Sequence, residues 1–160
     1  MKKYLFVSLF VVSATAMTVA LHSCNEQKDL TPPTICEADF LPADCDIYYL
    51  DDTIYVHFVC EDDAELGNYN IEIHNNFDHH THGTSSVDCD EEQHEHGNVE
   101  KAWVYNQDFA IARGLKCDTV NQKIPVPADA AEGDYHFMLR LTDRAGWQTL
   151  KAVAIHLHKP

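Results

Sequence analysis

Apolar residues recur at every second position along much of this chain of 160 residues. The clearest example is the segment in which Ile54, Val56, Phe58 and Cys60 alternate with residues of the opposite face. Successive side chains of a β-strand point to opposite faces of its sheet, so this alternation predicts a strand with one buried face. Further strands are expected at residues 69–74, 102–111, 120–127, 133–141 and 150–157.

The last two of these segments form the clearest local unit. Residues 142–147 separate them and contain Asp143 and Gly146, and such a turn between two alternating segments is typical of a β-hairpin. No segment has the 3.6-residue period of a helix, apart from the apolar N-terminus and one turn near residues 128–132. Short strands separated by turn signals indicate an all-β sandwich with a single core, rather than a parallel sheet with crossover helices.

The N-terminus has the pattern of an export signal. Lys2 and Lys3 precede an apolar run over residues 5–21, which ends at Leu21-His22-Ser23-Cys24. Serine and threonine interrupt this run, whereas a membrane-spanning helix needs about 20 apolar residues. Leu-x-Ser-Cys resembles the lipobox of bacterial lipoproteins, which implies cleavage before Cys24 and a membrane anchor of lipid on its sulfur. The alternative is an ordinary secreted protein with a free Cys24.

The sequence is expected to divide into three parts. Residues 1–23 are the lipoprotein signal peptide, and residues 24–33 are the acylated cysteine and a polar tether. Residues 34–160 are the sandwich domain, with a loop rich in histidine and acids at 75–99. The expected location is the cell envelope, where the lipid holds the domain on the periplasmic or the surface-exposed face of the outer membrane.

Acidic residues dominate the charge of the chain, whose formal net charge is −15. Removal of residues 1–23 takes away two lysines and no acid, which brings the net charge to −17. So acidic a surface repels phosphate backbones, which argues against nucleic-acid partners and favours cations. The alternative is that the acids only keep an exported domain soluble.

Five cysteines follow Cys24, in a compartment where disulfides persist. An odd number allows at most two bridges. Cys36 with Cys45 is the natural local pair and Cys89 with Cys117 a plausible second one, although the sequence does not determine the connectivity. Cys60 is then expected to be left over, as a small apolar residue of the core.

Two motifs near the ends of the domain resemble bacterial immunoglobulin-like domains. The run from Gly133-x-Tyr135 to Asp143-x-x-Gly146 is similar to their final hairpin, and Thr31-Pro32-Pro33-Thr34-Ile35 is similar to their first strand. This resemblance implies a single immunoglobulin-like β-sandwich of about seven strands.

A closer resemblance is carried by residues 71–82, with the sequence Ile-Glu-Ile-His-Asn-Asn-Phe-Asp-His-His-Thr-His. Tyr135-His136-Phe137 and Asp143-Arg144-Ala145-Gly146-Trp147 belong to the same pattern. Together these segments are similar to a family of small Bacteroidota lipoproteins, domain of unknown function 4625. The resemblance implies an immunoglobulin-like fold and an envelope lipoprotein, and it implies no established activity.

Histidine is unusually abundant, with 11 residues in the chain, and it is concentrated in the expected loop at residues 75–99. Loops longer than about 15 residues are usually functional or disordered. Imidazole and carboxylate are ligands of zinc, nickel and copper, whereas calcium takes oxygen alone. The loop histidines are His79, His80, His82, His94 and His96.

Strand geometry predicts where further imidazoles converge. In an immunoglobulin-like sandwich the strand that ends at His74 lies antiparallel to the strand that begins near residue 135. His74 and His136 then meet on the outward face, and counting across the last hairpin puts His156 diagonal to His136, within reach on that face. These three imidazoles are expected to bind zinc or another transition metal, with a fourth ligand from His79, His80 or His82.

Three alternatives compete with this metal site. The histidines are polar surface residues without a ligand, which is the expectation for His57 and His158. The domain is a non-catalytic interaction module that binds a glycan, a host protein or a partner subunit through Trp103, Tyr105 and Trp147. Calcium is the less favoured cation, at a site formed by Glu61-Asp62-Asp63 and Asp143.

Catalysis has no support in the sequence. The chain lacks a Gly-x-Ser-x-Gly elbow, a His-Glu-x-x-His helix and a glycine-rich phosphate loop. We therefore expect no enzymatic activity.

Overall fold

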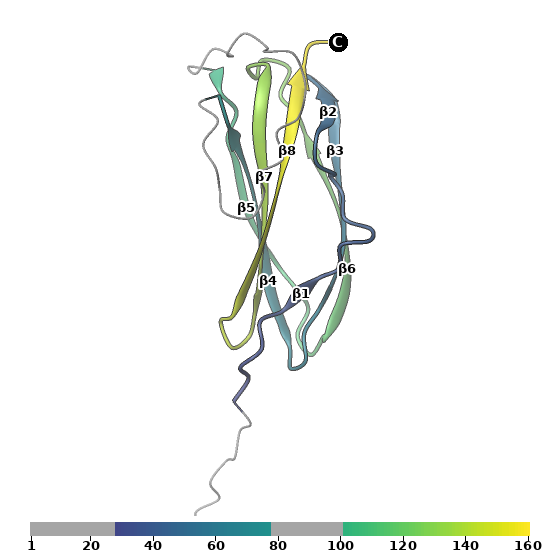
Figure 1. Ribbon diagram of the computed structural model, residues 1–160, viewed down its shortest axis with the longest axis vertical. Helices are drawn as coiled ribbons and strands as arrows, with labels where there is room; N and C mark the ends of the chain where they lie inside the picture. Colours follow the sequence, from purple (N-terminus) through teal and green to yellow (C-terminus); the bar gives the residue numbers. More distant parts are fainter. Residues whose placement is uncertain (1–27, 78–100) are drawn as a thin grey trace, which may run out of the picture.

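The computed structural model describes residues 28–77 and 101–160, which form two β-sheets packed face to face (Figure 1). One sheet has the strand order β1-β3-β6 and the other the order β2-β8-β7-β4-β5. The strands are β1 (Thr34–Ile35), β2 (Asp46–Tyr49), β3 (Thr53–Glu61), β4 (Leu66–Asn75), β5 (Tyr105–Ala110), β6 (Cys117–Pro125), β7 (Gly133–Asp143) and β8 (Gln148–His158).

The expected all-β class is confirmed, because these eight strands include every strand predicted from the alternation and no helix occurs in the described residues. In the same part of the chain, no helix has the length and apolar character to cross a bilayer. The expected signal peptide and Cys24 lie outside the described residues.

The core fills the space between the two sheets with the apolar side chains of alternate residues. Ile54 and Phe58 of the three-stranded sheet are completely buried, as are Ile73 and Phe137 of the five-stranded sheet. Aromatic contacts cross between the layers: the rings of Phe58 and Tyr69 meet edge to face with centroids 5.4 Å apart. Removal of this apolar surface from water is the main stabilising contribution to such a fold.

β7 is the centre of the five-stranded sheet, with antiparallel neighbours on both sides. It pairs with β4 over most of its length and with β8 through the predicted C-terminal hairpin. Asp143 closes that hairpin, because its Oδ1 accepts hydrogen bonds from the backbone N–H groups of Gly146 and Trp147 at 2.6 and 2.8 Å.

β2 is a strand that the sequence did not predict. It lies parallel to the end of β8 at the edge of the five-stranded sheet, with Ile47 beside His156 and Tyr49 beside His158. Both Ile47 and Tyr49 are exposed, so a search for alternating buried apolar residues does not identify this strand.

The expected cysteine pairs are wrong. Cys36 and Cys117 are free thiols, whereas Cys45 forms a disulfide whose other half lies outside the described residues. The backbone N–H of Cys36 donates to Val59 of the three-stranded sheet, and that of Cys45 donates to Ala154 of the five-stranded sheet. The two cysteines are therefore held by different layers. Cys60 is free and completely buried, in agreement with its expected place in the core.

We predict that iodoacetamide at pH 8 modifies exposed Cys117 in the native protein and leaves Cys60 intact. Burial is the main cause that raises the pKa of the Cys60 thiol to about 12, and thiolate is the reactive form. Peptide mass spectrometry after timed alkylation measures both rates, and the same experiment in guanidinium chloride is the control. Similar rates at the two cysteines in the native protein would contradict the burial of Cys60.

The hydroxyl of Tyr135 connects β7 to two loops. It donates to the carbonyl of Ala131 at 2.9 Å and accepts from the backbone N–H of Trp103 at 3.1 Å. Tyr135 is completely buried, so its hydroxyl and these backbone groups depend on one another for hydrogen bonds.

We predict that Tyr135→Phe lowers the free energy of unfolding by about 1–3 kcal/mol, because it leaves a buried donor and acceptor unpaired. Urea denaturation followed by circular dichroism measures the change. Tyr55→Phe is the matched control, since Tyr55 is exposed on the three-stranded sheet, and a change within about 0.5 kcal/mol is expected there. If Tyr135→Phe lowers the free energy of unfolding no more than Tyr55→Phe does, the hydrogen bonds of the Tyr135 hydroxyl do not stabilise the fold.

Candidate functional site

His74 and His136 face each other across two neighbouring strands at one end of the five-stranded sheet. They are direct partners in the β4–β7 register, and their ring centroids lie 5.6 Å apart. The two histidines therefore meet on neighbouring strands, as expected from the strand arrangement of an immunoglobulin-like sandwich. Neighbouring positions with opposite orientation, such as Ile73 and Phe137, face the core, so the two imidazoles lie on the outward side of the sheet.

His156 extends this group to β8. Its register partner on β7 is Asp134, and the partner of His136 is Ala154, so His156 is diagonal to His136 as expected. His158 follows on the same face, with its ring centroid 6.3 Å from that of His156. The structure thus places four imidazoles along this end of the sheet in two close pairs. His158, which was expected to be a surface residue, is half-buried.

These outward positions are shielded from solvent. His136 and His156 are only 6% and 4% exposed, and Met138 on the same face is buried as well. Both faces of β7 are therefore buried at this end, which differs from a strand with one face in water. Buried imidazoles require polar partners, because an unpaired buried polar group is costly.

Carboxylates supply two of these contacts. Glu72 Oε1 lies 3.1 Å from Nδ1 of His74, and Asp134 Oδ1 lies 2.6 Å from Nδ1 of His156. Each carboxylate brings negative charge close to an imidazole ring. This arrangement is common for histidines that bind metal through Nε2. Neither acid was predicted from the sequence, although each stands two residues before a site histidine, in Glu72-x-His74 and Asp134-x-His136.

The described imidazoles alone do not complete a metal site. Nitrogens of His74, His136 and His156 do not form a group of three within 4.8 Å of one another. The expected loop ligands His79, His80 and His82 lie outside the described residues. The described arrangement is thus a pair of adjacent imidazoles with a third on the next strand.

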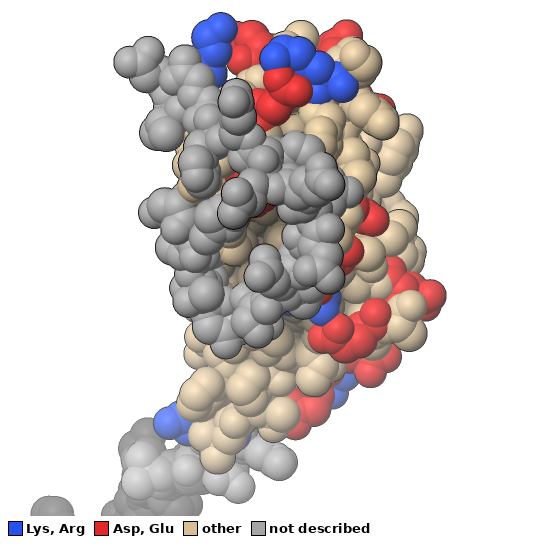
Figure 2. All heavy atoms as spheres, turned by 45° about the horizontal axis from the view of Figure 1, so that its top comes forward, with Lys and Arg blue, Asp and Glu red and all other residues tan. Residues whose placement is uncertain are grey.

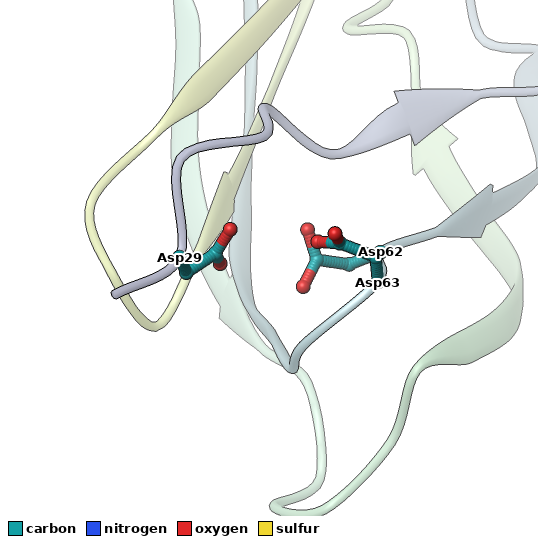
Figure 3. A group of neighbouring side chains, drawn as sticks. All are labelled: Asp29, Asp62 and Asp63. Atoms are coloured by element: carbon teal, nitrogen blue, oxygen red, sulfur yellow. The ribbon is translucent and has the colours of Figure 1, made fainter. Parts of the chain in front are cut away.

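A different set of potential ligands does converge at the other end of the sandwich (Figure 3). Asp29, Asp62 and Asp63 each contribute a carboxylate oxygen to a group within 4.8 Å. The expected calcium site paired Asp62 and Asp63 with Glu61 and Asp143, and neither of these two acids belongs to the group. Asp29 was missed, because it precedes the first strand.

One family model matches residues 22–158, which is most of the chain, and its description is Domain of unknown function (DUF4625). The chain belongs to this family.

Solved structures add a distant likeness. The DUF4625 chain is similar to the sporulation control protein Spo0M from Bacillus subtilis, with 12% sequence identity and a TM-score of 0.42. The match covers 82% of the DUF4625 chain and 51% of that protein, so the chain spans about half the length of its structural relative. Comparison with curated proteins finds no match.

Aromatic residues proposed for an interaction platform are separated in this DUF4625 protein. Trp103 and Tyr105 pack partly buried against the core, and the Trp103 ring centroid is 6.4 Å from that of Tyr135. Trp147 is 41% exposed at the β7–β8 turn, at the opposite end of β7 (Figure 1). The three side chains therefore do not form one surface.

Acidic side chains gather along the right-hand side of the molecule in Figure 2, whereas basic side chains gather mainly at its top edge. This distribution agrees with the net charge of −15. A surface of this kind raises the local concentration of cations.

Proposed function

We propose that this DUF4625 protein binds a transition metal ion such as zinc through His74 and His136. The observation that carries the proposal is their direct opposition across β4 and β7, with ring centroids 5.6 Å apart. Neighbouring strands fix both backbones, so no backbone has to become ordered when one ion binds both rings.

His156 is the proposed third ligand. It lies on the next strand, diagonal to His136, whose register partner on β8 is Ala154. Zinc prefers four ligands in a tetrahedron, and the candidates for the remaining position are His79, His80 and His82. The carboxylates of Glu72 and Asp134 orient the rings of His74 and His156 and increase the basicity of Nε2.

The protein is further proposed to be an immunoglobulin-like envelope lipoprotein anchored through Cys24. The lipobox-like Leu21-His22-Ser23-Cys24 supports the anchor, and the two-layer all-β architecture is compatible with an immunoglobulin-like fold. In this setting the ion is held outside the cytoplasm, either for capture and transfer or to order the histidine-rich segment at residues 75–99.

We expect the full chain, purified in mild detergent without a histidine tag, to bind about one equivalent of zinc. His74→Gln and His136→Gln should each weaken binding by about tenfold or more, because each removes one ligand and keeps a polar side chain. Isothermal titration calorimetry measures affinity and stoichiometry, and circular dichroism checks that each variant is folded.

His57→Gln is the matched control for these substitutions. His57 lies on the three-stranded sheet with its Nδ1 2.8 Å from Asn121, so zinc affinity should not change. Lowering the pH from 7.5 to 5 should weaken binding, because imidazole has an ordinary pKa of about 6.5 and must be neutral to bind metal. Zinc binding that survives both site substitutions would remove the proposed ligands.

If the wild-type chain binds no zinc, copper or nickel, the metal function is wrong. A non-catalytic interaction module that binds a glycan, a host protein or a partner subunit is then the better hypothesis. The exposed Ile47 and Tyr49 on edge strand β2 would be the surface to test first in that case.

We predict that Cys24→Ser moves the protein from the membrane fraction to the soluble envelope fraction, because the lipid is the proposed source of membrane affinity. Membrane fractionation with and without the substitution measures this, and intact-mass analysis of the wild type detects the acyl chains. Serine replacement of Cys117, an exposed free thiol, is the control and should leave the distribution unchanged. Membrane association that is independent of Cys24 would exclude the anchor.

A further inference from the structure

Three carboxylates meet where the N-terminal segment joins the sandwich. Asp62 and Asp63 follow β3, and Asp29 approaches them from the segment before β1 (Figure 3). Their carboxylates point toward one another, and one oxygen of each lies within 4.8 Å of the others. Like charges at this separation repel, so the group is unfavourable unless a cation lies among its members.

Asp62 differs from an ordinary acidic residue of the surface, because its side chain is buried. It is only 8% exposed. Its Oδ1 accepts hydrogen bonds from the backbone N–H groups of Ala64 and Glu65 at 2.9 and 2.6 Å. Its Oδ2 is buried and accepts no hydrogen bond within the described part of the chain. A buried carboxylate oxygen without a donor is costly, and a bound cation would compensate it.

The remaining contacts of the group leave the negative charge largely uncompensated. Thr31 donates to Asp29 Oδ1 through its backbone N–H at 3.0 Å and to Asp63 Oδ2 through its hydroxyl at 3.2 Å. The ammonium of Lys116 donates to the backbone carbonyl of Asp63 at 2.7 Å, not to its carboxylate. None of the three carboxylates forms an ion pair with a described lysine or arginine.

The β7–β8 turn fixes the acids relative to one another. The indole N–H of Trp147 donates to the carbonyl of Asp29 at 3.1 Å, which holds the N-terminal segment against the turn. The backbone N–H of Arg144 in the same turn donates to the carbonyl of Glu65 at 3.0 Å, which holds the loop that carries Asp62. The site is therefore built from two segments that one hairpin brings together.

The donor set selects the class of cation. All three ligands are carboxylate oxygens, and a hard cation prefers oxygen, whereas zinc and copper prefer nitrogen or sulfur. Calcium takes about six to eight oxygen ligands in a flexible geometry, whereas magnesium demands a near-ideal octahedron and keeps several of its waters. Three carboxylates on two loops therefore suit calcium better than magnesium.

We infer that Asp29, Asp62 and Asp63 bind a calcium ion, which ties the N-terminal segment to the end of the sandwich. The ion neutralises the mutual repulsion of the acids and provides the missing partner of Asp62 Oδ2. Calcium then controls the rigidity of the connection between the domain and the residues that precede it. This site is separate from the histidines, which lie at the other end of β4 and β7 (Figure 1).

Calorimetry of the full chain, purified in mild detergent and freed of metal, tests the inference with calcium chloride as the probe. One equivalent should bind with a dissociation constant of about 10⁻⁴ to 10⁻³ M, the range of extracellular calcium modules, and magnesium should bind more weakly. Asp29→Asn and Asp62→Asn should each weaken calcium binding at least about tenfold, because each replaces a charged ligand by a neutral one. Asparagine keeps an oxygen that accepts the hydrogen bonds of Oδ1.

Asp129→Asn is the matched control, since Asp129 is exposed in the loop before β7 and the charge change is the same. It should leave calcium binding unchanged, and so should His74→Gln. If Asp62→Asn fails to fold, Asp29→Asn decides the result, because Asp29 lies outside both sheets. No binding by the wild type up to 10 mM calcium chloride, or equal binding by wild type and Asp29→Asn, would overturn the site.

Proteolysis gives a second measurement, which reports whether calcium holds the N-terminal segment against the sandwich. Lys28 is exposed directly before Asp29, so endoproteinase Lys-C should cleave there. Calcium should slow this cleavage severalfold in the wild type and in Asp129→Asn, and not in Asp62→Asn. Calcium binding without such protection would show that the ion does not hold the segment.

Discussion

Burial of one face of the five-stranded sheet determines the arrangement of everything on its other face. Ile71, Ile73, Tyr135 and Phe137 are completely buried between the layers. Because side chains alternate, a slip of β4 by one residue against β7 would turn Ile71 and Ile73 outward. The register that the core requires is the same register that puts His74 opposite His136. The facing of the two histidines is thus specified by core residues on the other side of the sheet.

Period-two alternation explains how much of this fold the sequence predicts. It identifies β3, β4, β7 and β8 because each buries one face, and the Asp143 turn determines the register of the hairpin. β2 was not predicted, because it does not bury an apolar face. It has four residues, two of them exposed and apolar, and its parallel partner β8 is distant in the chain. The cysteine pairs were wrong because spacing along the chain says nothing about the layer to which each cysteine is bonded.

The candidate site was predictable to a similar extent. Counting across one turn is enough to align His136 with His156, whereas His74 could be placed only by assuming which strands are neighbours. The carboxylate next to each His was visible in the sequence, but only the register shows that Asp134 contacts His156 rather than His136. Asp29 was beyond such reasoning, because its position depends on the contact of its carbonyl with the indole of Trp147 rather than on any strand.

The two ends of the sandwich have different chemistry, and the strands separate them. The N-terminal segment and the three acids lie at the end with the β7–β8 turn, while the imidazoles lie near the start of β7 (Figure 1). Eleven residues of β7 span about 30 Å at the usual rise of a strand. The two groups of side chains are therefore too far apart to share an ion, so a substitution at one end changes the local electrostatics of that end alone.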